Sequence, residues 1–127
     1  MAASVVRNLF TVFLCISIDV FLCVELNVFH EDQYVPVGQP VTIKCHASDT
    51  SKPVFWDHRR SVRQNVHNVY DGGLIGDYQQ RCTIDSSTYD LTILHVELTD
   101  TGEYWCIENY GTLHVTELYV KGIVELL

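Results

Sequence analysis

The sequence predicts an all-β protein built as a sandwich of two β-sheets. From Glu25 onward, short segments of alternating apolar and polar residues are separated by turn residues such as glycine, proline and aspartate. No apolar repeat at helical spacing is long enough to predict a helix. Cys45 and Cys106 lie 61 positions apart, and each falls on the apolar phase of its segment. These observations favour a two-layer β fold over a helical or mixed one.

The expected strands follow one another along the chain. They lie at residues 25–30, 41–45, 54–56, 66–70, 81–85, 91–93, 104–106 and 113–120, and residues 74–75 add a short ninth. Pro36 and Gly38 break the chain after the first strand, which is typical of an edge strand that changes sheets. Asp71-Gly72-Gly73 predicts a tight turn, because glycine adopts positive φ at little cost. The side chains expected to point inward are Val41, Ile43, Cys45, Trp56, Cys82, Ile84, Leu91, Ile93, Tyr104 and Cys106.

A compact motif precedes the second of the two distant cysteines. The segment Leu98-Thr-Asp-Thr-Gly-Glu-Tyr-Trp-Cys106 resembles, position by position, the L-x-D-x-G-x-Y-x-C signature of the immunoglobulin superfamily. The resemblance covers residues 25–120 and implies an immunoglobulin-like sandwich. The space between Trp56 and Arg81 has room for an extra pair of strands, which implies the variable type, or V-set. The short link from Glu108 to Thr112, without a Gly-x-Gly bulge, differs from rearranged antigen receptors.

The resemblance also implies structural roles for single residues. It implies a disulfide between Cys45 and Cys106, with Trp56 packed against it and Tyr104 and Leu91 in the core. For a loop of this length, the disulfide contributes about 4 kcal/mol to stability. A salt bridge between Arg81 and Asp100 is expected from the same family pattern.

Cys82 stands where the family usually has a bulky apolar residue, and three states are open for it. It can be a buried free thiol that packs as a small apolar side chain. It can form an intermolecular disulfide if the strand faces the other way. It can also pair with Cys23 if a signal segment is cut before that residue.

The N-terminal segment predicts secretion. Arg7 is followed by an apolar run from Leu9 to Ile18, so residues 1–23 are expected to be a cleaved signal peptide, with the domain at 24–121 and a tail at 122–127. Five cysteines and a net charge of −8 fit a secreted or cell-surface module, and the acidic balance argues against nucleic acid as a partner. No membrane span is expected in this chain, which is therefore predicted to be secreted, or the ectodomain of a receptor if it is truncated.

Alternation predicts what faces solvent. The neighbours of Trp56 and Cys106 must point away from the core, which gives one exposed apolar patch with a basic rim. The expected partner-binding residues are Phe55, Trp105, Ile107, Arg59, Arg60 and Arg63. The alternative is that a neighbouring loop covers Trp105.

The expected function is extracellular recognition of a partner protein in immune or cell-surface contexts, without catalysis. The alternative is a structural or adhesion module that self-associates through the same face. The Tyr-Trp-Cys ending also resembles innate immune receptors such as the polymeric immunoglobulin receptor and its single-domain relatives. No catalytic elbow, metal-ligand spacing or phosphate loop is visible, so no enzyme activity, cofactor or metal is expected.

Overall fold

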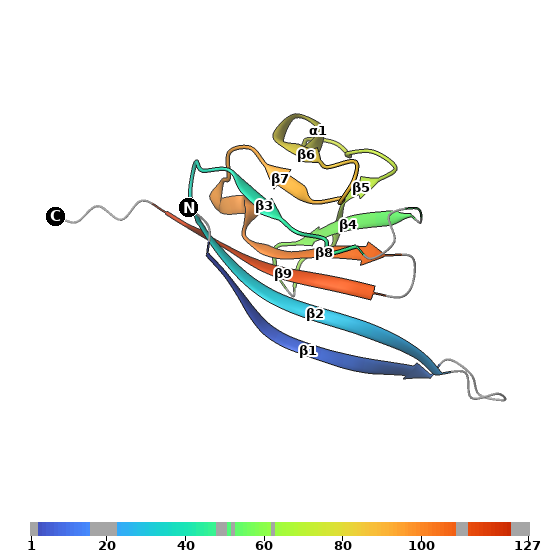
Figure 1. The fold of residues 1–127 in the computed structure, drawn as a ribbon. Helices are drawn as coiled ribbons and strands as arrows, with labels where there is room; N and C mark the ends of the chain where they lie inside the picture. The colour runs from blue at the N-terminus through green and yellow to red at the C-terminus, as the bar shows by residue number, and fades with distance from the viewer. Residues whose placement is uncertain are drawn as a thin grey trace.

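Two β-sheets packed face to face make up the fold, seen in a computed structural model that describes residues 3–15, 23–47, 51, 53–61, 63–108 and 112–122 (Figure 1). The strands are β1 (Ala3–Cys15), β2 (Cys23–Pro36), β3 (Val41–Ile43), β4 (Val54–Arg59), β5 (His67–Asp71), β6 (Cys82–Ile84), β7 (Leu91–Ile93), β8 (Gly102–Glu108) and β9 (Thr112–Lys121). One short helix, α1 (Tyr78–Arg81), and one 3₁₀ turn, η1 (Leu98–Asp100), complete the described elements. The predicted all-β sandwich is confirmed.

The strand order is that of a sandwich with one large and one small layer. The large sheet has the order β1-β2-β9-β8-β4-β5, and the small sheet has the order β3-β7-β6. Strands β2 and β9 run parallel, and the other neighbours run antiparallel. Figure 1 shows the small sheet over the β8–β4 side of the large one, with β1 and β2 extending beyond it.

The core lies between the two sheets, where the alternating side chains of both meet. Trp56, Leu91 and Tyr104 are all 0% exposed. The disulfide joins Cys45 to Cys106, as the family pattern implies. The indole Nε1 of Trp56 donates a hydrogen bond to the Tyr89 carbonyl oxygen at 2.7 Å, so its one polar atom is satisfied inside the core.

The corner before β8 is held by a second set of contacts. Arg81 and Asp100 form an ion pair, and the Tyr104 hydroxyl donates to the Asp100 carbonyl oxygen at 2.6 Å. Asp100 also accepts a hydrogen bond from the Glu97 backbone N–H at 2.7 Å. This buried aspartate therefore fixes the entry of β8 into the core.

The structure corrects two details of the strand assignment. Strand β2 does not change sheets at Pro36. It stays parallel to β9 up to the Pro36–Lys121 pair, and the Val37 N–H continues the pairing with a 2.8 Å bond to the Lys121 carbonyl. Arg81 does not open a strand, because it is the last residue of α1, and β6 begins at Cys82.

Cys82 is a buried free thiol, 4% exposed, on the core side of β6. Burial raises the pKa of this thiol to about 11, so the reactive thiolate is scarce at neutral pH. In the structure, Cys82 therefore forms neither of the two disulfides considered above.

The N-terminal prediction is not tested by the fold. In the full-length chain β1 pairs with β2, and cleavage near residue 23 would leave β2 as the edge of the large sheet. The limits at residues 23 and 121 stay predictions, and residues 123–127 of the expected tail lie outside the described part. Among the described residues, no helix has the length and apolar character needed to span a bilayer.

Candidate recognition face

The side of the large sheet that points away from β3, β6 and β7 is called the outer face here. Cross-strand partners share a face, so the strand register identifies its members. They are Val28, His30, Asp32, Tyr34, Phe55, Asp57, Arg59, Asp71, Glu103, Trp105, Ile107, Leu113, Val115, Glu117 and Tyr119. The structure therefore brings Phe55, Trp105 and Ile107 onto one surface.

A row of apolar side chains crosses the outer face from β4 to β2. Phe55 on β4 lies opposite Ile107 on β8, Ile107 lies opposite Leu113 on β9, and Leu113 lies opposite Val28 on β2. Trp105 lies two residues before Ile107 on β8, and its partner on β4 is Asp57. The row joins four strands into one continuous apolar band.

Trp105 is braced by two charged neighbours. Its indole Nε1 donates to Glu103 Oε2 at 2.9 Å, and Arg59 Nη2 donates to the same oxygen at 2.8 Å. The Arg59 guanidinium also lies over the indole ring, 5.3 Å from the centroid. A cation over an indole face is attracted by the ring quadrupole, so the three side chains hold one another in place.

This brace corrects the expected exposure of the patch. Phe55, Trp105 and Ile107 are partly buried rather than fully exposed. Trp105 is covered on one side by Arg59, a side chain of its own sheet, and no loop is needed to explain its burial. Arg59 thus belongs to the face itself, with its charge neutralised by Glu103, and does not form part of a free basic rim.

Acidic residues dominate the charge of the outer face. Asp57 lies beside Trp105, and Asp71 lies opposite Phe55. Burial, and then the nearby charge of Asp71, raise the pKa of the Asp57 carboxyl. A cationic side chain of a partner protein would reduce the repulsion between the two carboxylates.

A stacked aromatic pair marks the other end of the outer face. The rings of Tyr34 and Tyr119 lie 4.9 Å apart and nearly parallel. The Lys121 ammonium lies over the Tyr34 ring, 5.4 Å from its centroid. The outer face thus carries two groups of aromatic side chains, Phe55 with Trp105 and Tyr34 with Tyr119.

Arg60 and Arg63, the two other arginines of the predicted rim, do not lie on the outer face. Arg60 lines a separate cleft beside β5 and α1, and Arg63 is exposed on the link between β4 and β5. The three arginines of the predicted basic rim therefore lie in three different environments.

Sequence reasoning missed Glu103 and Asp57, although the signal for both was present. Each lies on the same strand phase as Trp105 or Phe55, so alternation alone places it on the outer face. No group of histidine, cysteine, aspartate and glutamate side chains in the described part of the chain is arranged to hold a metal ion.

Comparison with known proteins gives two similarities. A family model described as "Immunoglobulin domain" matches residues 25–109. Roundabout homolog 1 from Mus musculus and Roundabout homolog 1 from Homo sapiens are each 34% identical to this chain over 92 residues. The aligned part is 71% of this chain and 5% of each relative, so the chain spans a small fraction of these proteins.

Proposed function

Because this chain belongs to the immunoglobulin domain family, we propose that it is an extracellular recognition module of the variable type. It binds a partner protein through the outer face and catalyses no reaction. The proposal rests on the site and not on the fold, since the same sandwich supports many functions.

The strand order supports the variable type. Variable domains add strands to the sheet that holds the third and the last two strands of the sandwich. Here β5 extends the β9-β8-β4 sheet at the β4 edge, and Tyr70 forms an isolated bridge to Leu74. The V-set assignment and the likeness to the polymeric immunoglobulin receptor are parts of this proposal.

The braced Trp105 is the observation that carries the proposed binding site. Tryptophan, tyrosine and arginine supply most of the large energetic contributions in protein interfaces. A side chain that is already held by neighbours loses little conformational entropy on binding. Trp105, fixed by Glu103 and Arg59 beside the apolar row, has this character.

The charge of the face indicates the kind of partner. Asp57 and Asp71 make no hydrogen bond or ion pair through their carboxylates within the described part of the chain. Complementary potentials speed association and reject partners of like charge. We therefore expect the bound protein surface to be basic near its contact with Phe55 and Trp105.

An extracellular location is supported by two features. Disulfides such as Cys45–Cys106 persist in oxidising compartments. The apolar run before residue 23 has the order of a secretion signal. Secretion of the full chain from a eukaryotic host, followed by N-terminal sequencing of the product, tests both this location and the cut site.

The binding proposal is tested with the secreted chain as a multivalent probe on an array of cell-surface and secreted proteins. For any captured partner, we expect Trp105→Ala to weaken binding by about thirtyfold, the usual size for a central interface residue. Phe55→Ala should weaken it less. Thr83→Ala, an exposed change on the small sheet, is the matched control.

Self-association is the competing outcome of that test. A concentration-dependent dimer in sedimentation, abolished by Trp105→Ala, would identify a second copy as the partner. If both aromatic variants keep their thermal stability and all binding, the outer face is not the recognition site.

A further inference from the structure

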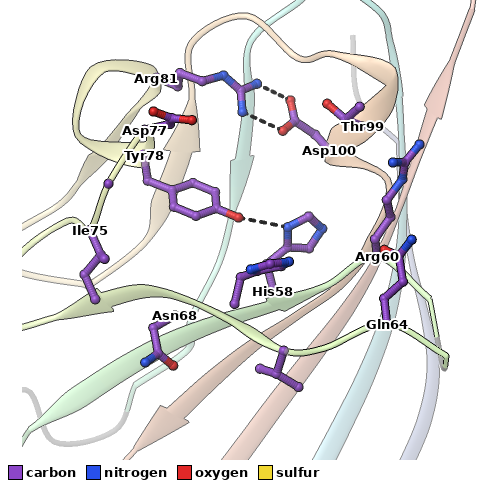
Figure 2. Close-up of a pocket in the computed structure, with 13 residues that line it drawn as sticks. His58, Arg60, Gln64, Asn68, Ile75, Asp77, Tyr78, Arg81, Thr99 and Asp100 are labelled. Atoms are coloured by element: carbon purple, nitrogen blue, oxygen red, sulfur yellow. Dashed lines mark hydrogen bonds and ion pairs between the residues drawn. The ribbon is translucent and has the colours of Figure 1, made fainter.

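A hollow lies away from the outer face, between β5, α1 and η1 (Figure 2). Its volume is about 640 Å³, within the range of pockets that hold a drug-sized ligand. None of Phe55, Trp105 and Ile107 lines it. This hollow, called the β5–α1 cleft below, is therefore a separate surface.

The back wall of the cleft is fixed by internal hydrogen bonds. His58 Nε2 lies 3.2 Å from the Thr101 carbonyl oxygen, and His58 Nδ1 lies 3.1 Å from the Tyr78 hydroxyl. A carbonyl only accepts, so Nε2 carries the proton and the Tyr78 hydroxyl donates to Nδ1. Burial lowers the pKa of His58, which keeps this wall neutral at physiological pH.

The mouth of the cleft, in contrast, carries polar groups without internal partners. The side chains of Arg60, Gln64, His67, Asn68 and Asp77 make no hydrogen bond or ion pair in the described part of the chain. Gln64 and Asn68 each offer an amide donor and an amide acceptor, the same groups that a peptide backbone presents. These groups are available to a ligand.

Two charges of opposite sign stand on opposite sides of the cleft. Figure 2 shows Arg60 with Gln64 on one side and Asp77 with Ile75 on the other. The nearby Arg81 and Asp100 neutralise each other in an ion pair. The free charges of the cleft are therefore one cation and one anion, apart from each other.

Two exposed aliphatic side chains line the cleft together with the polar groups. Val66 is 46% exposed and Ile75 is 38% exposed, and both line the cleft. Within the described residues, the other exposed large apolar side chains are Leu94 and Leu98, which do not line it. Burying a branched aliphatic side chain is worth about 1.5–3 kcal/mol, so an apolar group of a ligand is stabilised here.

We propose that the β5–α1 cleft binds an extended segment of a partner protein that carries a carboxylate and a cationic side chain on either side of an aliphatic one. The segment places a carboxylate at Arg60, an aliphatic side chain between Val66 and Ile75, and a cationic side chain at Asp77. The amides of Gln64 and Asn68 bond its backbone. This inference rests on the proposed function as a protein-binding module and adds a second contact to it.

The test uses defined peptides and NMR titration of the ¹⁵N-labelled full chain. The probe is acetyl-Glu-Gly-Val-Gly-Lys-amide, with variants of one to three glycines on each side, and the reference is the uncharged set based on acetyl-Gln-Gly-Val-Gly-Gln-amide. We expect the charged set to bind at about millimolar affinity and to shift the amides of 66–68 and 75–78. The uncharged set should bind at least tenfold more weakly.

Charge variants test the two charged contacts. Arg60→Glu and Asp77→Lys should each weaken the charged peptide at least tenfold, because each removes a charge-assisted contact. The double variant Arg60→Glu/Asp77→Lys should regain binding, because the peptide can pair with the exchanged charges in the opposite chain direction. Arg63→Glu, in the same basic segment but outside the lining, is the matched control and should leave binding unchanged.

Three results would overturn the proposal. They are equal binding of the charged and uncharged peptides, shifts confined to the outer face, and shifts in the cleft produced by an acidic oligosaccharide but by no peptide. Trp105→Ala should leave the peptide titration unchanged. Loss of partner binding in that variant with an intact peptide response therefore separates the outer face from the cleft.

Discussion

Arg81 donates hydrogen bonds to both carboxylate oxygens of Asp100, at 2.9 and 2.5 Å, and so ties the end of α1 to the turn before β8. The carboxylate is 3% exposed and the guanidinium side chain is 26% exposed. The hydrogen bond and charge of Asp100 raise the pKa of Arg81 above its already high value. The Arg81 guanidinium thus keeps its positive charge beside Asp100.

Removing the arginine should destabilise the domain strongly. Arg81→Met leaves Asp100 as a buried charge without its main partner, and such changes cost about 3–5 kcal/mol, less here because Arg81 is partly exposed. We expect a loss of about 3 kcal/mol in the free energy of unfolding, measured by urea titration. Arg63→Met, an exposed arginine, is the control and should change stability by less than about 0.5 kcal/mol. Equal effects of the two changes would contradict a structural role for the pair.

Gly102 in the same corner should tolerate no side chain. Its φ is +132°, and an added Cβ would lie 2.7 Å from the Arg60 Cα and even closer to the Arg59 carbonyl oxygen. Both obstacles are backbone atoms, which cannot rotate away. Gly102→Ala should therefore cost about 2 kcal/mol or more, seen as a lower thermal midpoint. Gly73→Ala, with open space around its Cβ position, is the matched control and should unfold almost as the parent does.

The disulfide between Cys45 and Cys106 should be needed for folding. A bridge that closes a loop of 61 residues contributes about 4 kcal/mol in the chain-entropy model. Small domains have a total margin of about 5–15 kcal/mol, so Cys45→Ala/Cys106→Ala should sharply reduce the secreted yield and the midpoint of denaturation. Cys82→Ala removes a buried thiol but keeps the bridge, and it should be far less harmful. A double variant that unfolds at the parent midpoint would show that packing alone holds the sheets.

The sequence predicted best what depends on local periodicity. Val41 and Ile43 are buried and Thr42 between them is exposed, because side-chain alternation in a strand needs no distant partner. The motif that ends at Cys106 likewise carries its own geometry, since the Tyr104 hydroxyl donates to the Asp100 carbonyl oxygen within one corner. For these residues the spacing was sufficient.

The sequence predicted less well what depends on contacts between distant segments. Arg59 does not belong to a free basic rim, because Glu103 on another strand accepts its hydrogen bond and its guanidinium lies over the Trp105 ring. Strand β2 stays in its sheet because β9 pairs with it up to Lys121. The helix α1 has four residues, too few for any periodic signal. The β5–α1 cleft forms where β5, α1 and η1 meet, three segments that are separate in the sequence, so residue spacing could not predict it.

A buried histidine should make the fold sensitive to mild acid. His114 stacks on Phe29 at 4.6 Å between ring centroids, and its Nε2 is buried without a hydrogen-bond partner. Burial, and then the neighbouring His46, lower the pKa of His114 to about 4, while Glu108 and Glu31 oppose the shift. The folded protein therefore resists protonation at this site.

The sign of the resulting pH dependence follows from linkage. In the unfolded chain His114 takes up a proton near pH 6.5, whereas in the folded chain it does so only near pH 4. Its contribution to stability is therefore complete above about pH 6.5 and is lost as the pH falls toward 4. We expect the thermal midpoint, followed by circular dichroism, to fall steadily over this interval. His114→Phe keeps the ring stack and removes the titration, so its midpoint should fall less, with the remainder due partly to His58, whose pKa is also lowered. His95→Gln, at an exposed histidine, is the control and should follow the parent curve. A His114→Phe curve as steep as that of the parent would place the acid sensitivity elsewhere.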